Sequence, residues 1–273
     1  MIKTLYISDL DGTLLRNDQT ISAFTADTVG KLTKKGLLFS YATARSIVTA
    51  SKVTSNLRVK LPVIVFNGTF ITETETKKHL YSNIFTFEES KQILDTLIKS
   101  EIFPVVNAFF GENEKFSFIQ GKETNGLHTF LDERRNDARK RPVCEKEALY
   151  DGDIFHIACI DTKEKLRPAY ERFKEDFPCV LYRDMYSGDT WLELHPVGAT
   201  KAAAAVTLKK MLHCDRIVCF GDGKNDIPMF EIADESYAVA NADDELKAIA
   251  TAVIDSNEND GVAKWLAYHV QFS

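Results

Sequence analysis

The chain has 273 residues, of which 44% are hydrophobic and 27% are charged, a composition that excludes disordered and fibrous proteins. Its net charge of −6 at pH 7 argues against a nucleic-acid partner, because phosphate backbones are bound by basic surfaces. No apolar run approaches the length of a membrane-spanning helix, so we expect no membrane partner either. The sequence leaves the oligomeric state open.

The cysteines indicate a reducing compartment. They are odd in number and show no Cys-x-x-Cys spacing, which fits free thiols better than a disulfide framework. The N-terminal residues lead directly into a strand, without an apolar segment and cleavage site. We therefore expect a cytoplasmic protein.

The first predicted strand ends in two acidic residues. The apolar run at residues 5–7 indicates a buried strand, and Asp9, Asp11 and Gly12 follow it. Because residues two apart on a strand point to the same side, both acids are expected to face one pocket. That pocket would lie at the carboxyl edge of a sheet, where open α/β folds bind ligands. The arrangement suits a hard cation and a nucleophile.

Strand and helix patterns then alternate, which implies parallel βαβ units. The elements predicted in this part are a helix at 21–35, a strand at 37–42, a helix at 46–57, a strand at 62–66, and a turn at Asn67-Gly68 that leads into a small hairpin.

The pattern changes between about residue 84 and residue 188. The elements predicted there are helices at 88–100, 124–139 and 163–177, and strands at 104–110, 115–120, 153–160 and 179–183. The alternation then resumes with a strand at 191–195, a helix at 200–213, strands at 217–220, 236–239 and 252–254, and helices at 227–232 and 245–250. We therefore predict an α/β fold: a Rossmann-like parallel-sheet core formed by residues 1–83 and 189–273, with an inserted α+β cap domain at residues 84–188.

Polar residues follow strand ends that are far apart in the sequence: Asp9 with Asp11, then Thr43, then Asp222 with Asn225 and Asp226. Lys201 begins a predicted helix and adds a positive charge. The helix N-termini after these loops favour phosphate. Clustered acids would repel an anionic substrate unless a cation lay between them, and Mg²⁺ with oxygen ligands fits that requirement. The residues by themselves therefore indicate Mg²⁺-dependent phosphoryl chemistry.

These residues, in this order, resemble the haloacid dehalogenase superfamily of phosphatases. The matching segments are Asp9-Leu10-Asp11-Gly12-Thr13, Thr43, Lys201 and Gly221-Asp222-Gly223-Lys224-Asn225-Asp226. The placement of the insert is similar to the Cof-type subfamily with its α/β cap, as are Asn67-Gly68 before the insert and Ser256-Asn257-x-x-Asp260-Gly261-Val262-Ala263 near the end. The insert itself matches in placement and element type rather than in residues.

The resemblance implies a role for each matching position. Asp9 would attack phosphorus and form an aspartyl-phosphate, while Asp11 would protonate the leaving oxygen and later accept a proton from water. Asp9, Asp222 and the backbone carbonyl of Asp11 would bind Mg²⁺. Asp226 would orient Lys201 or a metal-bound water. The groups implied to hold the phosphoryl oxygens are the N–H groups of Leu10 and Ala44 and the side chains of Thr43, Lys201 and Asn225.

Two positions depart from the family's usual motifs. Ala44 stands where the second motif often has glycine, and Ala202 follows the lysine where glycine is common. Neither change removes a group that the reaction needs. Arg45 either binds substrate or braces the motif through a salt bridge, and we expect the bracing role.

The sequence therefore predicts a Mg²⁺-dependent phosphatase that hydrolyses small phosphorylated metabolites, with sugar phosphates as the leading class. The alternatives are a phosphomutase, which uses the same covalent intermediate, and a catalytically inactive regulator that binds phosphometabolites. A dehalogenase is disfavoured because it has no need of Asp11. Cap residues considered for substrate contact are Asn107, Arg183, Asp184 and Tyr186.

The histidines show no spacing typical of metal ligands. We therefore expect them to be structural or surface residues, namely His79, His128, His156, His195, His213 and His269.

Overall fold

The computed structural model describes residues 2–184 and 187–270, and these divide into two compact units. The first unit combines residues 2–82 with residues 199–270, and the second comprises the described residues between 83 and 198. Among the described residues, no helix has both the length and the apolar character needed to cross a membrane.

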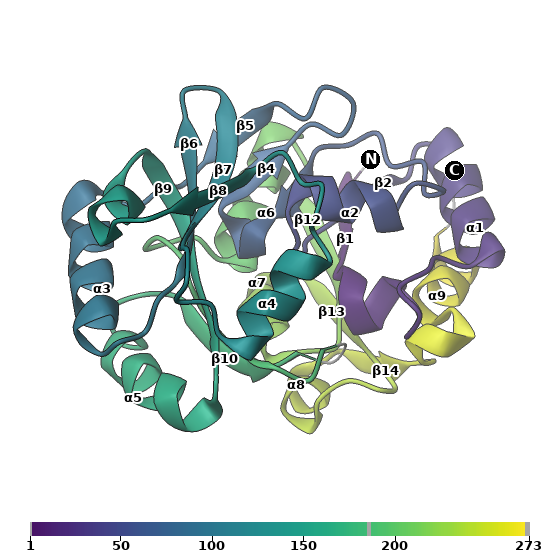
Figure 1. Ribbon diagram of the computed structural model, residues 1–273. Coiled ribbons are helices and arrows are strands. Elements are labelled where there is room, and N and C mark those ends of the chain that lie inside the picture. The colour runs from purple at the N-terminus through teal and green to yellow at the C-terminus, as the bar shows by residue number, and fades with distance from the viewer. Residues whose placement is uncertain (1, 185–186, 271–273) are drawn as a thin grey trace. The chain divides into compact units, whose positions relative to one another are not determined.

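The first unit is built on a parallel sheet with the strand order β14-β13-β12-β1-β2 (Figure 1). Its strands are β1 (Thr4–Ser8), β2 (Leu38–Tyr41), β12 (Arg216–Gly221), β13 (Glu235–Val239) and β14 (Ala252–Ile254). Leu5 and Ile7 of β1 are fully buried, as expected for a strand that is covered on both faces. The chain moves to β2 on one side of β1 and to β12 on the other. This reversal of strand order is where open α/β sheets bind ligands.

Three helices of the first unit begin at a side-chain cap. The side-chain oxygens of Ser22, Ser46 and Thr200 accept backbone N–H groups at the starts of α1, α2 and α6. Figure 1 shows α1 and α9 side by side. The helices are α1 (Ala23–Lys34), α2 (Ile47–Val53), α6 (Lys201–Met211), α7 (Ile227–Ile232), α8 (Asp244–Ile249) and α9 (Gly261–His269).

A small antiparallel sheet completes this unit. It consists of β3 (Val63–Val65), β4 (Phe70–Thr72) and β5 (His79–Ser82). The hairpin predicted after Asn67-Gly68 is confirmed, because β3 and β4 pair on either side of a helical turn at Phe66–Gly68. A parallel bridge between Ala42 and Ile64 links this sheet to the end of β2.

The second unit contains a sheet with the strand order β10-β11-β9-β6-β7-β8, in which β7 and β8 are parallel and the other pairs are antiparallel. Its strands are β6 (Val105–Phe110), β7 (Asn113–Ile119), β8 (Lys140–Val143), β9 (Asp153–Asp161), β10 (Cys179–Arg183) and β11 (Thr190–Leu194). Its helices are α3 (Phe87–Lys99), α4 (Asn125–Asp132) and α5 (Lys163–Phe173).

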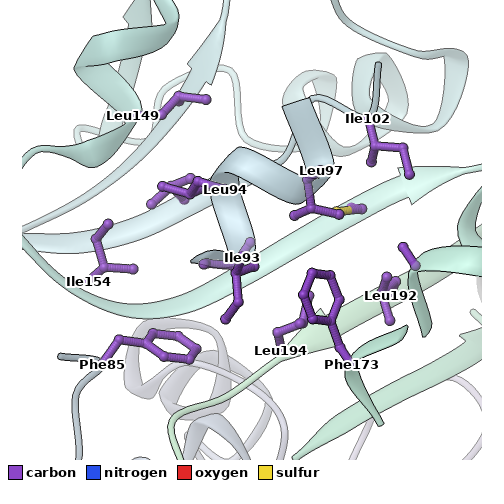
Figure 2. Packing of buried hydrophobic residues seen from close by; sticks show 14 of the residues in the cluster. Phe85, Ile93, Leu94, Leu97, Ile102, Leu149, Ile154, Phe173, Leu192 and Leu194 are labelled. Atoms are coloured by element: carbon purple, nitrogen blue, oxygen red, sulfur yellow. The ribbon is translucent and has the colours of Figure 1, made fainter. Parts of the chain in front are cut away.

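An apolar core joins α3 and α5 to one face of this sheet. Figure 2 shows Ile93 and Leu97 of α3 and Phe173 of α5 in one cluster with Leu192 and Leu194 of β11. These side chains are 0% exposed, and burial of each stabilises the unit by about 1.5–3 kcal/mol. A parallel-sheet core with an inserted α+β unit is the α/β architecture that the sequence predicted, and this prediction is confirmed.

The second unit differs from the predicted pattern in two main respects. The helix predicted at 124–139 ends at Asp132, and β8 follows a turn in which the carboxylate of Asp137 accepts the backbone N–H of Arg139 at 2.9 Å. β11 pairs along its length with β9 and β10, so it belongs to the second unit, whereas the sequence placed the return to the core at residue 189. A buried apolar strand has the same sequence pattern in either sheet, which is why the pairing could not be read from it.

Candidate active site

The carboxyl end of β1 carries a buried carboxylate that is held by a lysine. Asp9 is 6% exposed, and its backbone N–H donates to the carbonyl of Phe220 in β12 at 2.9 Å. Lys201, the first residue of α6, donates from Nζ to Asp9 Oδ1 at 2.6 Å and to Asp226 Oδ1 at 2.8 Å. The side chain of Lys201 is 1% exposed, so these charge-assisted bonds are shielded from water.

Acidic side chains converge beside this lysine. Asp9, Asp222 and Asp226 each offer a carboxylate oxygen, and these oxygens lie within 4.8 Å of one another. Asp226 is 0% exposed, and its Oδ2 accepts the backbone N–H groups of Asp222 at 3.1 Å and Gly223 at 3.2 Å. Asp226 is therefore committed to the lysine and the loop, which leaves Asp9 and Asp222 as the stronger candidates for metal ligands.

The electrostatics of the cluster indicate an excess of negative charge. Burial raises the pKa of Asp9 well above its ordinary value, and Lys201 opposes this rise while Asp226 and Asp222 add to it. Burial, followed by the charge of Asp226, raises the pKa of Asp222 to about 6. Burial by itself would lower the pKa of Lys201, but Asp226 and Asp9 outweigh it and raise that pKa. A set of hard oxygen donors with surplus negative charge fits a divalent cation with oxygen ligands.

The turn after Asp9 requires glycine and orients Asp222. Gly12 has φ +75°, and a Cβ atom there would lie 2.2 Å from Asp222 Oδ2, so a larger residue would displace this carboxylate. Thr13 donates from Oγ1 to Asp222 Oδ1 at 2.9 Å, and Asn241 donates from Nδ2 to the carbonyl of Gly12 at 2.7 Å. The loop and the carboxylate therefore fix each other.

The side chain of Asp11 is held by Arg45. Nε of Arg45 donates to Asp11 Oδ2 at 2.8 Å and Nη2 donates to Oδ1 at 2.5 Å, a two-point ion pair that Gln19 extends by accepting from Nη2 at 2.9 Å. The bracing contact expected of Arg45 is thus present. Arg45 thus holds the carboxylate of Asp11. Asp11 is not one of the three residues of the acidic cluster, which are Asp9, Asp222 and Asp226.

Candidate phosphate ligands flank Asp9 on both neighbouring strands. Thr43 and Ala44 follow β2, and Asn225 follows β12, so all three reach the sheet edge at which β1 ends. The hydroxyl of Thr43 accepts the backbone N–H of Arg45 at 3.1 Å and keeps its own proton to donate. Asn225 Nδ2 donates to Asn67 Oδ1 at 3.4 Å. Leu10, which supplies a backbone N–H, follows Asp9 directly and is fully buried.

Comparison with known proteins identifies the family of this chain. The family model for haloacid dehalogenase-like hydrolases matches residues 6–266. The chain belongs to this family. The resemblance inferred from the sequence is therefore confirmed.

Curated relatives of this hydrolase include phosphatases. Two proteins of Bacillus subtilis, each named a 5-amino-6-(5-phospho-D-ribitylamino)uracil phosphatase, are similar to it along their length. One is 26% identical and covers 94% of this chain and 95% of its own length, and the other is 27% identical and covers 94% of each. The hydrolase is accordingly an enzyme, a phosphatase of the haloacid dehalogenase-like family, and its substrate is a phosphorylated molecule.

Solved structures support the fold of the hydrolase. A crystal structure from Thermotoga maritima has a TM-score of 0.77 with 24% identity, covering 100% of this chain and 99% of the other. A crystal structure from Eubacterium rectale has a TM-score of 0.79 with 21% identity, covering 98% of this chain and 99% of the other. The architecture is thus shared along the whole chain.

The C-terminal motif of the hydrolase braces the loop that follows Asp9, a role that the sequence did not suggest. Asn257 donates from Nδ2 to the carbonyl of Leu15 at 3.0 Å, and its N–H donates to Asn241 Oδ1 at 3.0 Å. Asp260 pairs with Arg16 at 3.0 Å. Thr13 and Asn67 were present in the quoted motifs, but nothing in their spacing revealed that they contact Asp222 and Asn225.

Of the residues considered for contact with substrate in the second unit, Asn107 is buried and its Nδ2 lies 2.9 Å from His156 Nδ1. Arg183 and Asp184 make hydrogen bonds within their own loop. Tyr186 lies outside the described residues.

Proposed function

We propose that this phosphatase is Mg²⁺-dependent and hydrolyses small phosphorylated metabolites, with sugar phosphates as the leading class. The observation that carries the proposal is the position of Asp9. It is a buried carboxylate at the strand-order reversal, held by Lys201 and within 4.8 Å of the carboxylate oxygens of Asp222 and Asp226. A nucleophile, a cation site and a fixed positive charge thus converge on one point.

Asp9, Asp222 and the backbone carbonyl of Asp11 are the groups that would hold Mg²⁺. When bound, the ion would polarise a phosphoryl oxygen and screen the negative charges of Asp9 and the substrate from each other. Thr13 orients Asp222 for this role through its hydrogen bond of 2.9 Å. Asp226 keeps Lys201 charged and in place, because it accepts from Nζ at 2.8 Å.

Asp9 and Asp11 divide the reaction between them. A carboxylate oxygen of Asp9 attacks phosphorus, the bond from phosphorus to the ester oxygen breaks, and Asp11 donates a proton to the departing oxygen. In the second step Asp11 accepts a proton from a water molecule that attacks the aspartyl-phosphate, which releases inorganic phosphate and restores Asp9. Because Asp11 is paired with Arg45 at 2.5 Å, this ion pair must open before Asp11 can donate its proton.

The remaining polar groups hold the transferring phosphoryl oxygens. The backbone N–H groups of Leu10 and Ala44, the hydroxyl of Thr43, the amide of Asn225 and the ammonium of Lys201 are the donors for this role. They come from the loops after β1, β2 and β12 and from the start of α6, all within the first unit. Fixed donors of this kind stabilise charge in the transition state without reorganising.

The substrate class rests on the relatives and on the insert. The relatives from Bacillus subtilis are named for a substrate that carries a phosphorylated ribityl group, which is an open-chain sugar alcohol. We extend this chemistry to the present chain as a polyhydroxylated phosphate monoester. The second unit, inserted between Ser82 and Ala199, is proposed as the cap that selects the leaving group.

Covalent catalysis is tested with Asp9→Asn and Asp11→Asn and an aryl phosphate whose phenol leaves without protonation. We expect Asp9→Asn to release no phenol. Asp11→Asn should release about one equivalent in a burst and then turn over roughly 10² to 10⁴ times more slowly than the wild type, because the second step lacks its base. Rapid-mixing absorbance measurements give both values.

Steady turnover by Asp9→Asn would remove Asp9 as the nucleophile, and an Asp11→Asn protein without a burst would remove the covalent step. Release of inorganic phosphate from a sugar monophosphate without an added bisphosphate distinguishes a phosphatase from a phosphomutase. A panel of phosphorylated sugars, sugar alcohols and aryl phosphates, ranked by kcat/KM, tests the substrate class. The proposed substrate class is wrong if the aryl phosphates have higher kcat/KM values than all of the polyhydroxylated phosphates.

A further inference from the structure

A buried polar cluster lies within the second unit. It consists of His156 on β9, Glu193 on β11 and His195 directly after β11. These three residues are 6%, 7% and 2% exposed, respectively. Each offers one possible ligand atom, and the three atoms lie within 4.8 Å of one another. The acidic site of Asp9 belongs to the first unit, so this cluster is a separate group of side chains.

The sheet itself brings these side chains together. β11 is antiparallel to β9, and the register that pairs Leu194 with Ile157 places His195 beside His156. Glu193 and His195 are two residues apart and therefore point to the same face. Strand pairing sets the positions of His156 and Glu193, and the backbone N–H of His195 donates to the carbonyl of Pro178 at 2.9 Å. The arrangement is therefore held by backbone hydrogen bonds at all three positions.

The distances in the cluster suit ligands of a shared ion. His156 Nε2 lies 3.8 Å from Glu193 Oε1, and His195 Nε2 lies 3.8 Å from Glu193 Oε2. Atoms that bind one metal at about 2.0–2.2 Å are roughly 3–3.5 Å apart, so a small shift of each side chain would complete the site.

We propose that His156, Glu193 and His195 bind a divalent transition-metal ion, with Zn²⁺ as the leading candidate. Imidazole nitrogens with one carboxylate form a donor set that suits Zn²⁺ and its first-row neighbours, whereas Mg²⁺ favours oxygen ligands. The two sites of the molecule are thus expected to differ in the metal that they select. Bound here, the ion would tie β9 to β11 and stabilise the sheet.

Burial and the neighbouring charges shift the pKa values of two residues of the cluster. Burial lowers the pKa of His156 to about 4, with Glu193 opposing the change and His195 adding to it. Burial alone would raise the pKa of Glu193, but His195, His156 and Tyr182 outweigh that effect and lower it.

Neighbouring polar groups can orient the ligands. Asn107 Nδ2 lies 2.9 Å from His156 Nδ1, and the hydroxyl of Tyr182 donates to Glu193 Oε1 at 3.2 Å. With its amide turned so that Oδ1 faces the ring, Asn107 accepts the Nδ1 proton and directs the Nε2 lone pair of His156 toward Glu193. Metal-binding histidines commonly donate their second N–H to an oxygen in this way.

The test is a titration of the metal-stripped protein with Co²⁺. The buffer contains millimolar Mg²⁺, so that Mg²⁺ occupies the proposed site at Asp9 and Asp222. We expect about one equivalent of Co²⁺ to bind and to give visible absorption bands typical of coordination by nitrogen and oxygen. Zn²⁺ should displace the Co²⁺ and raise the melting temperature by mass action. The Asp222→Asn protein should bind Co²⁺ as the wild type does, which separates this site from the acidic cluster.

Variants locate the ion. Glu193→Gln and His195→Gln should weaken Co²⁺ binding by at least roughly tenfold. His128→Gln, at an exposed position on α4 of the same unit, should leave binding unchanged. Cys144→Ser should do the same, which excludes binding by that exposed thiol. Far-UV circular dichroism of each variant without metal checks that it has folded.

The proposal is overturned if the wild type binds no stoichiometric Co²⁺, if folded Glu193→Gln and His195→Gln bind it as tightly as the wild type, or if Asp222→Asn loses it. Should both cluster variants fail to fold, the titration of Asp222→Asn decides alone. In that protein, loss of Co²⁺ binding contradicts the site, and retention with bands of nitrogen coordination supports it.

Discussion

Lys201 balances the acids around it. Its ammonium bonds to Asp9 and Asp226 at 2.6 and 2.8 Å in a site where all three side chains are nearly inaccessible to water. Removing one partner from a buried ionic group leaves an uncompensated charge, and the cost is about 3–5 kcal/mol. The lysine therefore supports the fold of the site as well as the reaction proposed for it, and substitutions there would confound the two effects.

Thr13 allows a cleaner test at the scale of single residues. Thr13→Val keeps the shape of the side chain but removes the hydroxyl that donates to Asp222 Oδ1 at 2.9 Å. We expect the Mg²⁺ concentration for half-maximal activity to rise by roughly tenfold, because a ligand without its orienting partner binds metal more weakly. Phosphate release measured over a Mg²⁺ titration gives this value.

Thr13→Ser is the matched control, since it retains the hydroxyl, and it should stay close to the wild type. At saturating Mg²⁺ the kcat of Thr13→Val should recover most of its wild-type value. A fall in kcat that no Mg²⁺ concentration restores would contradict the orienting role and would point to a direct effect on the chemical step.

At the scale of elements, Gly68 sets how closely the hairpin of β3 and β4 approaches α6. Its φ is +104°, and a Cβ atom there would lie 2.1 Å from the carbonyl oxygen of Thr200, the residue that caps α6. We expect Gly68→Ala to lower the free energy of unfolding by about 3 kcal/mol or more, because backbone strain and a steric clash add. Urea denaturation provides the measurement.

Gly36 offers a control with a similar φ but no clash. Its φ is +107°, and no atom lies within 4 Å of the position of its Cβ. Gly36→Ala should therefore cost only the strain, about 1–3 kcal/mol. If the two variants lose the same stability, the contact between Gly68 and Thr200 contributes nothing and the argument from close packing is wrong.

The elements also reveal what the sequence could predict. Asp9, Asp222 and Lys201 each stand beside a strand end or helix start with a strong local pattern, and so their convergence followed from the parallel sheet. The pairing of β11 with β9 is a long-range choice that leaves no local pattern, and the return to the core was placed too early for that reason. The cluster of His156 with His195 depends on the same pairing and was therefore missed.

The whole molecule depends on contacts between distant parts of the chain. β1 pairs with β12 across the entire insert, from Thr4 with Arg216 to Ser8 with Phe220. Both halves of the acidic site are joined by this pairing, since Asp9 follows β1 and Asp222 follows β12. The stability of the whole protein is consequently linked to the charge state of these carboxylates.

This linkage predicts how pH and Mg²⁺ act on stability. The pKa of Asp222 is raised from its ordinary 3.8 to about 6 in the folded chain, so the folded state holds the proton more tightly than the unfolded state. Without a divalent cation, this stabilising contribution is fully present below pH 3.8 and is lost as the pH rises through 6. Mg²⁺ needs the ionised carboxylate and therefore stabilises the protein above that pH.

We therefore expect the rise in melting temperature caused by Mg²⁺, relative to a chelator, to be small at pH 5 and several times larger at pH 8. Differential scanning fluorimetry across this range gives the comparison. In Asp222→Asn the increment should be small at both pH values, because the neutral amide neither titrates nor attracts the cation. Equal increments for the wild type at pH 5 and pH 8 would mean that Mg²⁺ acts elsewhere, and Asp222 would then be no ligand.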